Sequence, residues 1–356
     1  MSSNQSKPRL SEPQVAEIVQ RLYGLTLSSV RALPSYDDQN FQLEADRGAR
    51  FVLKVMNSVD SQNQNLIEVQ THAMTFLHQH GLPVQTVLST TAGELMSLEE
   101  IDCGNGCQKY LVRLLTYLPG ITISTVAVTP KLLYETGKIA ARMDKVLQEM
   151  DHPHVNALQR ENFIWSLSNI PLLENYLCFM DGAPLQNIVK AVIDQYKTCV
   201  VPKRCTFRKS INHGDFNDLN MLVEEDQTNG YKISGILDFS DMSSGYYVYE
   251  LAITIMYMMI ENPRPVEVGG PILAGWESEI PLNEEERDAL YLLVLSRFSQ
   301  SLLLAQHAVS QQPENEEYLM TTAKTGKRIL CQLWELGKEE VEKTWFQMAA
   351  QYADWE

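Results

Sequence analysis

The hydrophobic pattern of the chain changes at Pro119-Gly120, and this change constrains the fold more than any other feature. Before it, short apolar runs alternate with polar residues and are bounded by turn residues, as in β-strands. After it, apolar residues recur at helical spacing over long segments. Each pattern needs its own layer to bury its apolar face, so we expect an α+β chain with a small β-rich lobe and a large, mostly helical lobe.

The first part of the chain has one clear helix among its strands. The expected strands are Val30–Leu33, Asn40–Glu44, Arg50–Val55, Glu94–Leu98 and Tyr110–Leu118. Leu66–Gln79 has apolar residues at helical spacing and stops at Gly81. We expect residues 1–24 to form an N-terminal extension and a first helix, residues 25–118 the β-rich lobe, and residues 119–356 the helical lobe.

The second part is a series of helices that one hairpin interrupts. The expected helices are Pro130–Met150, Pro171–Phe179, Gln186–Val200, Gly245–Ile260, Asn283–His307, Glu317–Gly337 and Lys338–Asp354. The interruption consists of two strand-like segments, Asn220–Glu225 and Tyr231–Phe239, on either side of Asn229-Gly230. Because Asn-Gly is typical of tight hairpin turns, the two segments are predicted to pair antiparallel.

This hairpin would bring three oxygen-bearing side chains together. Asn220 opens its first strand, Asp238 closes its second, and Asp215 precedes both in His213-Gly214-Asp215. The open end of an antiparallel hairpin joins its first and last residues, so Asn220 and Asp238 should meet there. An amide oxygen and a carboxylate suit Mg²⁺, and a separate carboxylate can orient a hydroxyl and accept its proton. The pattern therefore predicts phosphoryl transfer.

The motif HGDxxxxN followed by IxDFxD resembles the aminoglycoside phosphotransferase and choline kinase-like group, over nearly the whole chain from about residue 25. The resemblance implies a two-lobed protein-kinase-like fold with a nucleotide bound between the lobes. By position, Asp215 matches the catalytic base of the group, and Asn220 and Asp238 match its Mg²⁺ ligands. His213 is expected to be a hydrogen-bonded structural residue.

The same resemblance implies a set of nucleotide-binding residues. Lys54 matches the phosphate-binding lysine of the group, and Glu68 is its expected partner, with Glu44 and Glu94 left open. No G-x-G-x-x-G is present, so the turn that begins at Ser35 is expected to cover the phosphates. The linker expected to pair with the base contains Leu115 and Tyr117.

Three runs, Ser35–Phe41, Tyr110–Gly120 and Gly245–Glu261, resemble members of the group that phosphorylate 5-hydroxy-L-lysine. That resemblance alone implies this acceptor, and GTP rather than ATP as donor. The net charge of −16 favours a cationic acceptor on separate grounds. The residues expected near the acceptor are Asp218, Asp241, Tyr246 and Glu250, with Glu261 as a further acid. The candidate cations for an acceptor carboxylate are Arg113, Arg264 and Arg297.

Other functions are left open by the residues themselves. A kinase for choline, ethanolamine or an aminoglycoside would use the same motif, and a non-catalytic nucleotide-binding scaffold could retain it. The acidic net charge argues against nucleic-acid and anionic-membrane partners. The longest apolar stretch, Leu251–Ile260, is short for a membrane span. The six scattered cysteines and the lack of a secretory signal pattern predict a cytoplasmic protein, and nothing in the sequence sets its oligomeric state.

Overall fold

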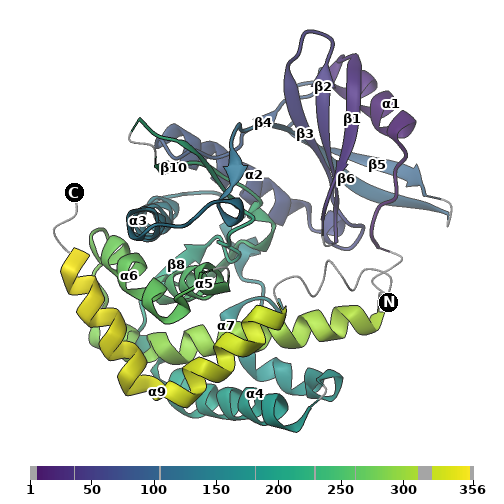
Figure 1. Cartoon of the computed structure of the whole chain (residues 1–356). Coiled ribbons are helices and arrows are strands. Elements are labelled where there is room, and N and C mark those ends of the chain that lie inside the picture. Colours follow the sequence, from purple (N-terminus) through teal and green to yellow (C-terminus); the bar gives the residue numbers. More distant parts are fainter. Residues whose placement is uncertain are drawn as a thin grey trace. The chain divides into compact units, whose positions relative to one another are not determined.

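The computed structural model describes residues 6–35, 37–103, 106–180, 182–227, 230–260, 262–311 and 323–352. The chain divides into two units, each described by itself below (Figure 1). The first unit comprises residues 1–119 and 152–157, and the second comprises residues 120–151 and 158–356. The main border between them lies at Pro119-Gly120.

A six-stranded antiparallel sheet forms the framework of the first unit. Its order is β1-β2-β3-β6-β4, and β5 also pairs with β6. The strands are β1 Leu27–Leu33, β2 Gln39–Ala45, β3 Arg50–Val55, β4 Val87–Leu88, β5 Ser97–Asp102 and β6 Cys107–Thr116. The strand expected at Glu94–Leu98 begins three residues later, at Ser97, because Glu94 closes a turn onto Thr90.

Two helices accompany this sheet. In α1, Glu12–Tyr23, the buried residues Val15, Ile18 and Val19 join the core formed by the strands. The expected N-terminal extension therefore supplies a core helix of the first unit. The second helix is α2, Gln64–Gln79, and the side chain of Asn63 caps it by accepting a hydrogen bond from Leu66 N.

Helices make up most of the second unit. They are α3 Pro130–Leu147, α4 Ala183–Gln195, α5 Tyr247–Ile260, α6 Gly269–Glu277, α7 Glu284–Gln311 and α9 Ala323–Tyr352. The two helices expected on either side of Gly337 are the two halves of α9, which the non-helical backbone of Gly337, with φ of 77° and ψ of 166°, separates. The segment expected as a helix at Pro171–Phe179 belongs to a 3₁₀ helix, Leu167–Phe179.

The sequence analysis missed α6 because Gly, Pro and Ala dominate it and resemble a loop. Small residues are needed there because α6 packs closely on α3. A Cβ on Gly275 would lie 1.9 Å from Tyr134 O, and a Cβ on Gly137 would lie 2.0 Å from Ile272 O. The glycines therefore allow backbone-to-backbone contact between the two helices.

The helix α7, light green in Figure 1, lies in the core of the second unit. By length and composition alone it could cross a membrane, since an 18-residue window has a mean hydropathy of 1.2. Because 89% of that window is buried inside the protein, α7 has the environment of a core helix. The helix expected at Asn283–His307 is thereby confirmed, and it extends four residues further, to Gln311.

The second unit also contains short strands. They are β7 Ile121–Thr122, β8 Lys209–Asn212, β9 Met221–Glu225, β10 Tyr231–Ile236 and β11 Ser243–Tyr246. The predicted β9–β10 hairpin is confirmed, with Met221 opposite Ile236, while Asn229 of its turn lies outside the described residues. The unpredicted pair β8–β11 joins the segment before His213 to the segment after Asp241.

Candidate active site

The open end of the hairpin brings Asn220 to the segment that carries Asp238. Leu237 N donates a hydrogen bond to Asn220 O at 2.8 Å, which extends the β9–β10 pairing by one step. Asp238 follows directly, so its backbone lies one residue from this contact. The local register of two short strands is enough to produce this arrangement.

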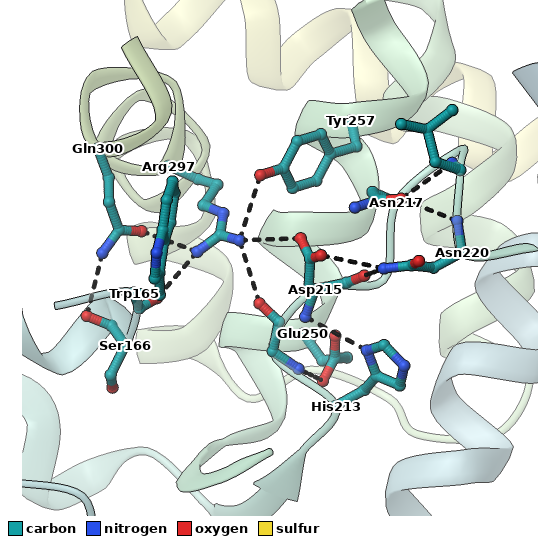
Figure 2. Close-up of polar contacts among 12 residues, drawn as sticks. Trp165, Ser166, His213, Asp215, Asn217, Asn220, Glu250, Tyr257, Arg297 and Gln300 are labelled. Carbon is teal, nitrogen blue, oxygen red and sulfur yellow. Dashed lines mark hydrogen bonds and ion pairs between the residues drawn. The ribbon is translucent and has the colours of Figure 1, made fainter. Parts of the chain in front are cut away.

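Asn220 is also joined to Asp215, as Figure 2 shows. Its Nδ2 donates to the backbone oxygen and to Oδ2 of Asp215, both at 3.0 Å. Among the described residues, the Oδ1 atom of Asn220 accepts no hydrogen bond. The side chain thus uses its amide hydrogens on Asp215 and keeps its oxygen for another partner.

Asn217, which the sequence analysis did not single out, shapes the loop between these two residues. Its Oδ1 accepts from Leu219 N and from Asn220 N, both at 2.9 Å. This is the local side-chain-to-backbone turn that asparagine favours, so the signal was present in the sequence. The turn fixes the distance between Asp215 and Asn220 (Figure 2).

Asp238 has the only positive φ among the described non-glycine residues, 53°. Its Oδ1 accepts hydrogen bonds from Ser240 Oγ at 2.6 Å and from Ser240 N at 3.2 Å. A left-handed backbone is unfavourable for most residues and concentrates at functional sites, where the surrounding structure maintains it. Ser240 thus holds the carboxylate of Asp238 in place.

The donor set at this end of the hairpin fits a magnesium ion. An amide oxygen from Asn220 and a carboxylate from Asp238 are the hard ligands that Mg²⁺ prefers. Within the described part of the chain, no three His, Cys, Asp or Glu side chains gather as a protein-only metal cage would require. A cation held here would therefore take its remaining ligands from phosphate and water, which is usual for Mg²⁺.

His213 and Gly214 shape the backbone that carries Asp215. His213 is fully buried; its Nε2 bonds Leu237 O at 2.8 Å, and its Nδ1 accepts from Asp215 N at 3.3 Å. Burial lowers the pKa of His213 below its ordinary value, which favours the neutral ring. Gly214 has φ of 83°, and a Cβ there would lie 2.7 Å from Asp241 O, so only glycine fits.

Glu250 supports the same loop from α5. Its Oε2 accepts a hydrogen bond from Gly214 N at 3.1 Å, and the residue is 0% exposed. Burial raises the pKa of Glu250 to about 7, against the opposing effect of the Gly214 and His213 amides. The expectation that Glu250 contacts the acceptor is corrected: it holds the backbone of the loop from inside the core.

Arg297, in the middle of α7, lies on the other side of Asp215 (Figure 2). Its Nη2 donates to Gly214 O at 3.1 Å, to Tyr257 Oη at 3.2 Å and to Asp215 Oδ1 at 3.3 Å. The Arg297 side chain is 0% exposed, whereas that of Asp215 is 26% exposed. Asp215 therefore remains accessible to a substrate, while Arg297 does not.

Two of the three candidate cations for an acceptor carboxylate are buried. Arg297 is buried, and Arg113 is 2% exposed in β6, where its Nη1 donates to Thr71. Arg264 is on the surface and pairs with Glu267 at 2.7 Å. A different arginine adjoins the loop: Arg160 Nη1 donates to Ser240 O and Met242 O, at 3.0 and 3.4 Å.

Asp241 is the predicted substrate residue that the structure places beside the loop of residues 213–220. It is half-buried, and its carboxylate makes no hydrogen bond or ion pair with another described residue. Burial raises its pKa to about 8; the charge of Asp215 adds to this effect, while Arg160 and Arg297 oppose it. The Asp241 side chain is therefore neutral near pH 7, or it ionises when a cation lies beside it.

The other predicted substrate residues have structural environments. Asp218 is 7% exposed, and its backbone oxygen accepts from Ser124 N at 3.2 Å. Tyr246 is partly exposed and packs edge-on against Phe207 and Tyr249, and its contact with the acceptor stays a prediction. Glu261 lies outside the described residues.

In the first unit, Lys54 has a partner that the sequence analysis missed. Its Nζ lies 3.1 Å from Asp38 Oδ2, while Asp38 Oδ1 accepts from Asn57 N at 2.8 Å. Glu68, the predicted partner of Lys54, instead lies 3.9 Å from His154 Nε2. The expected pairing is therefore wrong: the partner of Lys54 is Asp38, in the bend just before β2, whose residue Asn40 lies opposite Lys54.

The remaining predicted nucleotide residues are all in the first unit. Ser35 Oγ donates to Asp38 O at 2.5 Å, which fixes the turn before β2. Leu115 is 4% exposed in β6, opposite Val52. The ring of Tyr117 lies under the guanidinium of Arg50, 4.2 Å away.

Two buried carboxyl groups lie behind the catalytic loop in the second unit. Asp144 Oδ2 accepts from Ser210 Oγ at 2.9 Å and from Asn212 Nδ2 at 3.0 Å. Asp144 Oδ1 and Glu250 Oε1 have no hydrogen-bond partner within the described part of the chain. Burial raises the pKa of Asp144 well above its ordinary value, and the charge of Glu250 adds to this effect.

We expect Asp144→Asn to weaken the dependence of thermal stability on pH. Because the folded pKa of Asp144 exceeds its unfolded value, the folded state binds the additional proton. The stabilisation is complete below the ordinary aspartate value of 3.8 and is lost as pH rises through the folded pKa. The contribution of Asp144 to the Tm of the wild type should therefore fall as the pH rises above 3.8, and the neutral isostere should lose a few degrees less.

This expectation is measured by thermal unfolding at several pH values. Asp151→Asn, at an exposed position of the same unit, is the matched control and should keep the wild-type slope. Identical pH slopes for Asp144→Asn and the wild type would show that Asp144 ionises normally in the folded protein.

Comparisons with known proteins show the family of the chain. The family model described as "Phosphotransferase enzyme family" (APH) matches residues 29–291. Hydroxylysine kinase of Danio rerio is 62% identical over 352 residues, which cover 99% of each chain. Hydroxylysine kinase of Mus musculus is 47% identical over 362 residues, covering 99% of this chain and 96% of the relative.

Solved structures show the fold. An amicoumacin kinase in complex with AMP-PNP, Ca²⁺ and Ami has a TM-score of 0.68 at 16% identity, covering 92% of this chain and 98% of its own. A microcompartment-associated aminopropanol kinase has a TM-score of 0.64 at 17% identity, covering 91% and 98%. The predicted kinase-like α+β fold is thereby confirmed. The chain belongs to the phosphotransferase enzyme family and is a small-molecule kinase.

Proposed function

We propose that this chain transfers the γ-phosphoryl group of a nucleoside triphosphate to the hydroxyl of 5-hydroxy-L-lysine. The observation that carries the chemistry is the contact between Asp215 and Asn220 at the open end of the hairpin, beside Asp238. The acceptor is supported by relatives named hydroxylysine kinase that are 47% and 62% identical over 99% of this chain. The preference for GTP over ATP rests on the sequence resemblance.

Asp215 would act on the acceptor hydroxyl. One of its oxygens is bonded to Asn220 and the other to Arg297, so the carboxylate is held from two sides while part of it stays accessible. It would align the hydroxyl oxygen with the γ-phosphorus and take the hydroxyl proton as the new O–P bond forms. The bond from the γ-phosphorus to the bridging oxygen breaks, and the nucleoside diphosphate leaves.

The remaining groups would position the donor. Asn220 and Asp238 would hold Mg²⁺, which when bound neutralises charge on the phosphate oxygens. Lys54 would contact the α- and β-phosphates, with Asp38 as its partner in the protein. By resemblance, Ser35 would cover the phosphates. By the same resemblance, Leu115 and Tyr117 would contact the purine base of the nucleotide.

Asp241 would bind an ammonium group of the acceptor. Its half-buried carboxylate is beside the loop of Asp215, where the charges of Arg160 and Arg297 only partly oppose the effect of burial on its pKa. A positively charged acceptor group beside Asp241 would lower its pKa and favour its ionised form. The proposal therefore places a positively charged end of the acceptor against Asp241.

An acceptor panel tests this function. The purified chain is assayed with Mg²⁺ and either GTP or ATP, against 5-hydroxy-L-lysine, L-lysine, choline, ethanolamine and kanamycin. We expect rapid product formation with 5-hydroxy-L-lysine and GTP, and none with L-lysine, which lacks the hydroxyl. Faster turnover of choline, ethanolamine or kanamycin would assign a different acceptor. Nucleotide binding without turnover of any acceptor would favour a scaffold.

The compartment is a separate part of the proposal. All six cysteines are free thiols, and four of them are exposed. Unpaired, exposed cysteines are usual where thiols are kept reduced, so we propose a cytoplasmic location.

A further inference from the structure

We infer that Arg297 is a positioning residue for the phosphoryl-transfer reaction, which holds the carboxylate of Asp215 in its reactive orientation. The inference rests on the proposed role of Asp215 and adds a residue from a distant part of the chain. It is argued from the contacts around the Arg297 guanidinium, which Figure 2 shows.

One face of the guanidinium holds the catalytic loop at two adjacent residues. Nη2 donates to Gly214 O at 3.1 Å and to Asp215 Oδ1 at 3.3 Å. A single nitrogen therefore bonds both the backbone of residue 214 and the side chain of residue 215. Together with the Asn220 contact on Oδ2, this leaves the Asp215 carboxylate little freedom to rotate.

The opposite side of the guanidinium is anchored in the core. Nη1 donates to Trp165 O at 2.8 Å and to Gln300 Oε1 at 2.9 Å, and Gln300 Nε2 donates in turn to Ile164 O at 2.7 Å. The rings of Trp165 and Tyr257 lie 5.2 and 5.3 Å from the guanidinium carbon. The planar group is therefore fixed before it contacts Asp215, as positioning requires.

Electrostatics favour the same role. Burial by itself would lower the pKa of Arg297, but Tyr257, Asp215 and Asp241 raise it, with a net increase over the ordinary value. The group therefore stays cationic. Its charge offsets the mutual repulsion of Asp215 and Asp241, which would otherwise push the Asp215 carboxylate away from its position.

The sequence of α7 gives independent support. Charged residues are rarely fully buried unless they are paired. A short polar stripe nevertheless interrupts the apolar helix, and each member is 0% exposed: Ser296, Arg297, Ser299 and Gln300. Gln300 and Arg297 are one turn apart and bond each other, whereas Ser296 and Ser299 donate to Leu292 O and Leu295 O of the same helix.

Two substitutions at this position separate charge from geometry. Arg297→Lys keeps the charge, but its single side-chain nitrogen cannot bond both Trp165 O and Asp215 Oδ1. Arg297→Met keeps approximate length without charge. We expect kcat to fall by about 10-fold in the lysine variant and about 10²–10³-fold in the methionine variant, since small displacements of a reacting group have effects of this size. KM values for both substrates should stay within a few-fold, because Arg297 is buried away from substrate.

A combination with Asp215→Asn gives the decisive readout. If Arg297 acts through Asp215, adding Arg297→Lys to Asp215→Asn should cause no further loss of the residual rate. A residue that merely stabilises the fold would lower the rate by the same factor in both backgrounds. Arg208→Lys, in the pair of Arg208 with the buried Glu286, is the matched control and should retain wild-type kcat.

The outcomes distinguish the two proposals. Failure of the acceptor panel would overturn the proposed function, whereas near-normal activity of Asp215→Asn would overturn the role of Asp215 as the base. Suppose that Asp215→Asn is slow, as expected. The positioning role alone would then be overturned if Arg297→Lys lowered the rate by the same factor in the Asp215→Asn background as in the wild type. It would also be overturned if kcat were unchanged in both Arg297 variants. If Arg297→Met does not fold, Arg297→Lys and Tyr257→Phe decide, the latter removing one acceptor of the guanidinium. Tyr257→Phe should lower kcat by a few-fold without a change in KM, and an unchanged kcat in both would overturn the inference.

Discussion

Asp215→Asn is expected to lower kcat by about 10²–10⁴-fold, the usual contribution of a general base. Asparagine cannot accept the hydroxyl proton, yet its oxygen can still take the hydrogen bond from Arg297. Asn220 Nδ2 loses a side-chain acceptor but keeps the backbone oxygen of residue 215, so the loop should remain folded. Steady-state kinetics with 5-hydroxy-L-lysine and GTP, at saturating Mg²⁺, measure the effect.

The matched control for this substitution is Asp226→Asn, at the far end of the hairpin. Asp226 Oδ1 accepts from Gly230 N at 2.9 Å and belongs to the turn rather than to the site. That variant should keep wild-type kcat. A value for Asp215→Asn within 10-fold of the wild type, in a protein of normal Tm, would mean that another group accepts the proton.

Asp238→Asn should be the second severe substitution, with kcat/KM for the nucleotide reduced by about 10²–10³-fold. Asparagine tolerates the left-handed backbone at φ of 53° and can keep the acceptor oxygen for Ser240. The local structure is therefore preserved while the negative ligand is lost. The variant should also need a higher Mg²⁺ concentration for half-maximal rate.

A magnesium titration at fixed nucleotide concentration measures this effect. The curve for Asp238→Asn should move to higher concentration, whereas that for Asp215→Asn should keep its midpoint and lose only its plateau. An unchanged midpoint and plateau in Asp238→Asn would exclude Asp238 as a ligand of the metal that the reaction needs.

Only part of this site could be derived from the sequence. Asp215, Asn220 and Asp238 lie on one loop and one hairpin, so the register of neighbouring strands and the Asn-Gly turn were enough to relate them. Amphipathic periodicity likewise located most helices and strands to within a few residues, because each such element buries one face.

Contacts made across the core could not be derived in this way. Arg297 is 82 residues from Asp215, and no local pattern indicates that α7 delivers it to the loop. The same holds for the Lys54 partner, where Asp38, just before a neighbouring strand, replaced the expected Glu68 on a helix.

Burial also changed the meaning of residues that were correctly noticed. Glu250 was expected at the acceptor because it is acidic and close in sequence, but α5 places it inside, against Gly214 N. The sequence by itself thus determined the order of elements and the residues of the local catalytic hairpin, since both depend on short-range periodicity and turn geometry. Only the tertiary structure decided which distant side chains hold that hairpin in place, because helix packing sets their distances and burial sets their charges.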